Sequence, residues 1–226
     1  MVCRSRSRFL LALMAGLLPG VGIRCAAAET EPSYTIAFAS FGPRNTDLFV
    51  ADADGKNARP LVPHADNDYN ASFSRDGEWI VFTSYRQGSA DIYRVHLDCT
   101  GLERLTDDPA FDDQGALSPD GTQLVFVSNR GGHANLWLLN VATKKVSQLT
   151  KHTNGDFRPS WSPDGKWITF ATARGGFKDE AALHPYNGQP YGQIYVMRAD
   201  GSDVRQLSAD QFEEATPSFV PFPKHK

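Results

Sequence analysis

The chain has 226 residues, of which 41% are hydrophobic and 22% charged, and its formal net charge is −3 at pH 7. This mildly acidic balance argues against a nucleic-acid partner. Its three cysteines, Cys3, Cys25 and Cys99, lie too far apart for a zinc-type cluster. The length is sufficient for one hydrophobic core, so we expect the fold to depend on apolar packing.

The first 28 residues resemble an export signal. Three arginines within the first eight residues precede an apolar run at 9–18, and small residues at 26–28 offer a cleavage site. The run is much shorter than the roughly 20 residues of a spanning helix, so no membrane span is expected. We predict a cleaved signal peptide at 1–28 and a β-propeller domain at 29–226, located in the periplasm or secreted. Removing the signal takes away four arginines and no acids, which changes the net charge from −3 to −7.

A stretch of 14 residues recurs along the rest of the chain. Residues 157–170 run from an aromatic strand through a Pro-Asp-Gly turn into a second strand, and residues 69–82 and 113–126 follow the same pattern. Asp76, Asp120 and Asp164 mark the turns and are 44 residues apart both times. Aspartate and glycine are the residues that such turns require. A repeat of this length is typical of propeller blades.

Each repeat contains four short strand patterns. Apolar residues at every second position predict strands that are buried on one face, and no segment has a persuasive helical period. The second strand shows this best, with Phe38, Phe82, Phe126 and Phe170 two residues after Ile36, Ile80, Leu124 and Ile168. The sequence therefore predicts an all-β fold, a β-propeller of four four-stranded antiparallel blades.

The two ends of the repeat region are complementary. The first repeat, at Tyr34, starts with the second strand of a blade, whereas residues 216–221 match a first strand. We expect this C-terminal strand to join the N-terminal blade and to close the ring, because closure removes both open edges. A monomer is the favoured interpretation. A half-ring that pairs with a second copy is the alternative.

The repeat resembles that of TolB-type propellers, which are exported bacterial proteins related to WD-repeat propellers. The similarity rests on Ser-Trp-Ser-Pro-Asp-Gly at 160–165 and on the strand and turn at 194–201, and it covers about residues 34–221. The resemblance implies a scaffold that docks a cell-envelope protein or peptide. TolB itself has six blades after an α/β domain, whereas four blades and no such domain are expected here.

Acidic residues precede the first strand of every blade. When the repeats are aligned, positions 74, 118, 162 and 220 are equivalent. Six positions before each of them lies an acidic residue: Asp68, Asp112, Asp156 and Glu214. In a closed propeller they would surround the mouth of the central channel, where four carboxylates would repel each other unless a cation lay among them. Ca²⁺ suits such oxygen ligands, and a basic side chain of a partner would serve equally. The alternative is that each acid accepts hydrogen bonds from its own loop.

The last blade contains 14 additional residues within 176–192, between its second and third strands. Long loops on a rigid scaffold often bind ligands. We therefore predict a lid over the channel mouth that carries Phe177, His184, Tyr186 and Tyr191. The alternative is neutral variation in a loop that tolerates insertions.

Two further sets of polar residues repeat with the blade. Arginines follow the second strand at 86, 130 and 174, and we expect each to pair within its own blade, near Asp91, Asn135 and Gln193. A set with histidine or aspartate follows the fourth strand, and its positions far from the axis predict surface loops: His64, Asp108, His152 and Asp210.

The sequence favours a binding scaffold over an enzyme. It contains no Gly-x-Ser-x-Gly elbow, His-Glu-x-x-His helix, phosphate loop or dinucleotide fingerprint, so no catalytic residue is assigned. A propeller-type, metal-assisted polysaccharide lyase or hydrolase is the alternative function.

Overall fold

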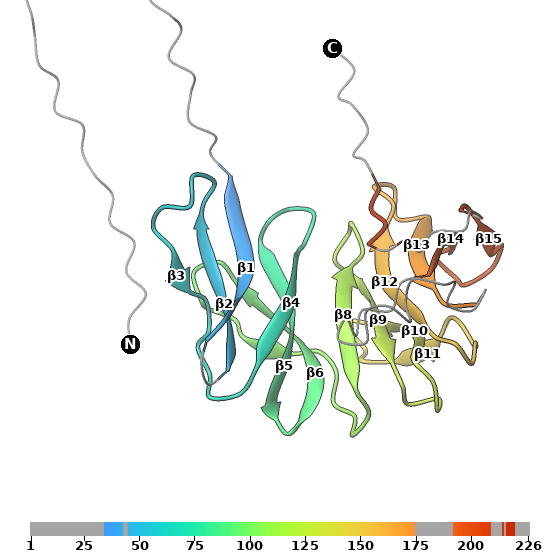
Figure 1. The fold of residues 1–226 in the computed structure, drawn as a ribbon, viewed down its shortest axis with the longest axis horizontal. Coiled ribbons are helices and arrows are strands. Elements are labelled where there is room, and N and C mark those ends of the chain that lie inside the picture. Colours follow the sequence, from blue (N-terminus) through green and yellow to red (C-terminus); the bar gives the residue numbers. More distant parts are fainter. Residues whose placement is uncertain (1–33, 43–44, 175–191, 209–213, 215, 220–226) are drawn as a thin grey trace, which may run out of the picture.

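The computed structural model describes residues 34–42, 45–174, 192–208, 214 and 216–219, which form four antiparallel sheets in sequence (Figure 1). The predicted signal peptide and the predicted lid residues lie outside the described residues. The described residues carry strands and no helix, so the all-β expectation is confirmed. None of them belongs to a helix long and apolar enough to cross a membrane.

The first sheet has three strands and the other three sheets have four. The first consists of β1 (Thr35–Phe41), β2 (Thr46–Asp52) and β3 (Arg59–Pro60). The second consists of β4 (Asp68–Phe73), β5 (Trp79–Gln87), β6 (Ser89–His96) and β7 (Glu103–Arg104). The third consists of β8 (Asp112–Leu117), β9 (Gln123–Ser128), β10 (Asn135–Asn140) and β11 (Val146–Gln148). The fourth consists of β12 (Asp156–Trp161), β13 (Trp167–Thr172), β14 (Gln193–Arg198) and β15 (Arg205–Gln206). We call these sheets blades 1 to 4.

The core lies between successive blades. Three clusters of buried apolar side chains fill the spaces between blades 1 and 2, 2 and 3, and 3 and 4. The repeated phenylalanines Phe82, Phe126 and Phe170 belong one to each cluster and are fully buried.

The second strands of blades 2 to 4 are buried on both faces, since neighbouring residues such as Val81 and Phe82 belong to different clusters. The expectation of burial on one face is therefore wrong for these strands, because each lies between two packed blades. In blade 1, Ile36 and Phe38 remain 41% and 39% exposed.

A left-handed residue interrupts the first strand of each blade from 2 to 4. Asn70, Gln114 and Arg158 have φ of 52°, 55° and 54°, and the register of each strand shifts there by a β-bulge. Thr216 lies at the same repeat position and has φ of 56°. Such a conformation is uncommon outside glycine, so its recurrence indicates that the backbone at Thr216 resembles an inner strand, as we call the first strand of each of blades 2 to 4.

Next to blade 4, Glu214 repeats a backbone contact that is also found between blades 3 and 4. The Glu214 amide donates to the Gly192 carbonyl, just as the Asp156 amide donates to the Ala134 carbonyl one blade earlier. Strand β1 pairs only with β2 among the described residues, and Figure 1 places it across the molecule from the end of the described chain, with β4 and β8 between. The structure shows no closed sheet, so the predicted closure is not confirmed.

The Asp-Gly turns are built as the sequence predicts. In blades 2 to 4 a serine hydroxyl donates to the aspartate two residues later, at 2.5, 2.6 and 2.6 Å for Ser74–Asp76, Ser118–Asp120 and Ser162–Asp164. Asp54 and Asp200 also accept a hydrogen bond within their turns, in their case from the backbone amide two residues later, at residues 56 and 202. The serine hydrogen bonds, followed by those from backbone amides, lower the pKa of Asp76, Asp120 and Asp164.

These turns give a prediction for acid stability. A lowered carboxyl pKa stabilises the fold above the unfolded value of about 3.8, and this stabilisation is lost as the pH falls through the folded pKa. Replacing Asp76, Asp120 and Asp164 together by asparagine should lower the stability at pH 7 and flatten its decline below pH 4. Urea unfolding between pH 7 and pH 3 measures both effects. An unchanged pH profile would contradict this account.

Candidate functional site

The repeated aspartates at the start of the inner strands are buried, not exposed at a channel mouth. Asp68, Asp112 and Asp156 have exposed fractions of 1%, 0% and 0%. Each forms an ion pair with the arginine that follows the second strand of its own blade, at 2.8, 2.6 and 2.9 Å: Arg86–Asp68, Arg130–Asp112 and Arg174–Asp156. The expected pairing within the blade is confirmed, but the partners are these aspartates and not the residues before the third strand.

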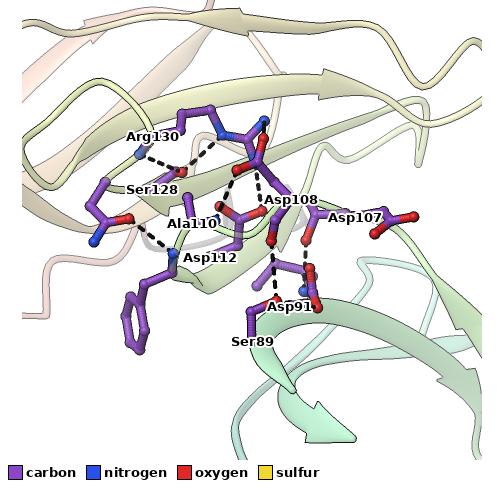
Figure 2. A network of polar contacts seen from close by, with 12 residues as sticks. Ser89, Asp91, Asp107, Asp108, Ala110, Asp112, Ser128 and Arg130 are labelled. Atoms are coloured by element: carbon purple, nitrogen blue, oxygen red, sulfur yellow. Dashed lines mark hydrogen bonds and ion pairs between the residues drawn. The ribbon is translucent and has the colours of Figure 1, made fainter. Parts of the chain in front are cut away.

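Each arginine lies over two aromatic rings of adjacent strands. The Arg130 guanidinium carbon is 5.3 Å from the ring centres of both Phe126 and Trp137, and its Nε donates to the Ser128 hydroxyl at 2.9 Å. Figure 2 shows Arg130 reaching Asp112 and Ser128 from one side. Blades 2 and 4 repeat the arrangement with Arg86 and Arg174. Such cation–π contacts stabilise a charge that is partly removed from water.

Burial raises the pKa of Asp68 and Asp112. Hydrogen bonds from Ser84 and Ser128 and the charges of the paired arginines lower it in part. Each carboxylate is therefore balanced by a cation of its own blade and has a structural role in fixing the end of that blade.

The described residues give no support to the predicted cation site at the acidic positions. Among the residues that the structure describes, no three histidine, cysteine, aspartate or glutamate side chains gather in a way that could hold a metal ion. The physical reason is that each aspartate already faces an arginine, so the carboxylates need no shared counter-ion. Glu214 forms an isolated β-bridge with Gly192. We therefore do not propose a Ca²⁺ site from Asp68, Asp112, Asp156 and Glu214.

A cavity of about 400 Å³ lies at the opposite end of the inner strands, beside the Asp-Gly turns. We call it the axial pocket. Its apolar wall is formed by four residues at equivalent repeat positions. Three of them end the inner strands of blades 2 to 4, and the fourth lies near the C-terminus: Phe73, Leu117, Trp161 and Phe219. Phe73 is 40% exposed although it is a large apolar residue, so it offers apolar surface to a ligand.

Polar contacts hold the axial pocket in shape. The Trp161 indole donates to the Ala116 carbonyl at 3.0 Å and fixes the ring against the neighbouring blade. Arg75 reaches from the turn of blade 2 to the Pro163 carbonyl of blade 4, at 3.0 Å, and places a guanidinium in the lining. The arrangement can receive an apolar group together with an anionic one.

The sequence did not predict this pocket, because the end of the blades that carries the Asp-Gly turns was assigned a purely structural role. One signal was present. Arg75 occupies the place that Pro119 and Pro163 take in the next two blades, and a turn does not require an arginine there. The residues after the fourth strand, in contrast, lie on surface loops as predicted: His64, Asp108 and His152. Asp210 lies outside the described residues.

These features define a β-propeller-type repeat protein with a pocket between its inner strands. The profile of the TolB beta propeller domain matches residues 109–225, more than half of the sequence. The chain belongs to the TolB β-propeller family, as the resemblance of its repeats indicated. A comparison with curated protein sequences found no match.

Several solved structures share the fold. TolB from Acinetobacter baumannii is 25% identical, with a TM-score of 0.65 over 81% of this chain and 43% of that chain. A TolB homologue from Agrobacterium tumefaciens is 23% identical, with a TM-score of 0.63 over 79% of this chain and 61% of that one. Oligogalacturonate lyase from Vibrio parahaemolyticus is 15% identical, with a TM-score of 0.52 over 76% and 48%. The chain thus spans less than two thirds of the length of these proteins.

Proposed function

We propose that this protein is an exported scaffold that binds a segment of another cell-envelope protein in its axial pocket. The proposal rests on one observation, a preformed cavity of about 400 Å³ between the inner strands that combines Phe73 and Trp161 with the guanidinium of Arg75. The export pattern at 1–28 and the family resemblance support a location in the periplasm. A partner segment with an apolar side chain next to a carboxylate would suit this lining.

The lyase alternative has less support. A likeness in fold at 15% identity carries no information about activity. A metal-assisted lyase needs a cluster of metal-ligating side chains, and the described part of the chain brings no three of them together. The axial pocket, lined by apolar residues, serine, proline and arginine, provides no acid–base pair.

A photo-crosslinking experiment tests the scaffold proposal. A photoreactive phenylalanine analogue at position 73 should crosslink, in envelope extracts, to a small number of defined proteins. The matched control is the same analogue at Phe41, which is 85% exposed and lies outside the pocket. The purified partner should then bind the wild type and the variant Phe41→Asp alike, and should bind Phe73→Asp at least tenfold more weakly.

Two results would overturn the proposal. Identical crosslinked products from positions 73 and 41 would show that the pocket has no selectivity. Crosslinks from position 73 only to a second copy of this chain would identify the face as a self-association surface.

A further inference from the structure

A second cavity of about 400 Å³ lies on blade 3, away from the axial pocket. We call it the blade 3 pocket. It lies where the second strand leads into the third and the fourth strand leaves the blade. Its lining includes His133, Asn135, Gln148, Lys151 and His152. Its lining contains no aspartate or glutamate.

The corresponding place in blade 2 is filled. Residues of blade 2 are found 44 positions earlier, and there Arg104 forms ion pairs with Asp91 at 2.7 Å and with Asp107 at 2.8 Å. Figure 2 shows Asp91, Asp107 and Asp108 gathered on this side of blade 2. The long side chain of Arg104 thus occupies the space, and the carboxylates balance its charge.

Blade 3 changes the charge at all four positions, neutralising three of them and reversing one. Gln148 replaces Arg104, Asn135 replaces Asp91, Lys151 replaces Asp107 and His152 replaces Asp108. The formal charge of the four positions changes from −2 to +1 with histidine counted as neutral. The shorter Gln148 leaves space that the arginine fills in blade 2. In blade 4 the equivalent Gln193 and Gln206 bond to each other at 2.5 Å, whereas Gln148 faces Asn135 in a cavity.

The blade 3 pocket is also held rigidly. Asn135 has an exposed fraction of 2%, and its Oδ1 accepts the His152 amide at 2.7 Å. Its Nδ2 donates to the carbonyls of His133 and His152, both at 3.2 Å. The Asn154 amide donates to Nδ1 of His152 at 3.2 Å, which leaves Nε2–H as the donor that this ring can offer to a ligand.

We propose that the blade 3 pocket binds a small organic anion, a carboxylate or a phosphate ester. The Lys151 ammonium, the His152 Nε2–H and the Gln148 amide supply donors, and no carboxylate in the lining repels an anion. The volume lies in the range of small-molecule sites, roughly 300–1,000 Å³. This site differs in position and in ligand chemistry from the axial pocket, so it stands independently of the proposed scaffold function.

Isothermal titration of the purified chain with citrate and with glucose 6-phosphate tests the proposal and separates the two anion sources. At least one of them should bind with one-to-one stoichiometry. Lys151→Asp restores the residue of blade 2, and Gln148→Glu places a carboxylate in the lining, so each should weaken anion binding at least tenfold. Lys145→Asp is the matched control, because Lys145 is exposed on the same blade, does not line the pocket and changes the net charge equally to Lys151→Asp.

Thermal melts of each variant show whether it is folded before it is titrated. The proposal is overturned if neither anion binds the wild type. It is also overturned if Lys145→Asp weakens binding as much as Lys151→Asp, since the effect would then come from overall charge. Unchanged affinity in a folded Gln148→Glu variant would place the anion elsewhere.

Discussion

Replacing Asp112 by asparagine should lower the free energy of unfolding by about 3 kcal/mol, because removing one partner of a buried ion pair leaves the other charge uncompensated. Asp112 has an exposed fraction of 0% and lies 2.6 Å from Arg130. Asp108, at 3.6 Å from Arg130, compensates only part of the loss. For a domain of this size the midpoint of thermal unfolding should fall by roughly 6–12 °C.

The matched control is Asp107→Asn, which removes a carboxylate from the same loop. The Asp107 side chain is 82% exposed, and exposed ion pairs are worth about 0–1 kcal/mol. Denaturant unfolding of both variants measures the difference. If Asp112→Asn costs no more than Asp107→Asn, the aspartate does not have the structural role assigned to it, and a role in ligand binding becomes the better interpretation.

The fold was predictable because its determinants are local. The 44-residue spacing of Asp76, Asp120 and Asp164, the serine that bonds each of them, and the alternating apolar positions are all visible in the sequence. Turn chemistry and the alternation of apolar positions depend on nearby residues, and repetition identifies the blade. The way the blades follow one another in space is set by packing between sheets, so ring closure could not be derived from the same pattern.

The partner of each repeated arginine was predicted only in part. Sequence proximity favoured Asp91 for Arg86, five residues away, whereas the structure selects Asp68, eighteen residues away. Antiparallel pairing of β4 with β5 places Asp68 opposite Ser84, next to the arginine. The pattern of acidic residues likewise located the aspartates but not the arginines that face them.

The two pockets differ in how far they can be predicted from the sequence. The axial pocket requires four inner segments to meet, which is a property of the assembled arc. The blade 3 pocket could have been found by aligning blades 2 and 3, because the change from Arg104 to Gln148 with Asp107 to Lys151 is readable in the sequence. A substitution at one position of a repeat is informative when it changes both the size and the charge of the side chain.

Replacing Phe126 by alanine should have an effect at least as large as Asp112→Asn, with a loss of about 3–5 kcal/mol in the free energy of unfolding. Phe126 is fully buried in the cluster between blades 2 and 3, and its ring also supports the Arg130 guanidinium at 5.3 Å. Phe126→Leu keeps most of the volume and removes the ring, so it should cost less than about 1.5 kcal/mol from packing.

A double-mutant cycle between Phe126→Leu and Asp112→Asn separates packing from charge. Both residues act on Arg130, one through its ring and the other through its carboxylate, so their effects should not add. We expect an interaction energy of about 0.5–2 kcal/mol, the size of a partly desolvated cation–π contact. Additive losses in urea unfolding would show that ring and carboxylate stabilise blade 3 separately. A measurable coupling would show that Asp112, Arg130 and Phe126 act as one unit, which Arg86 and Arg174 repeat in the neighbouring blades.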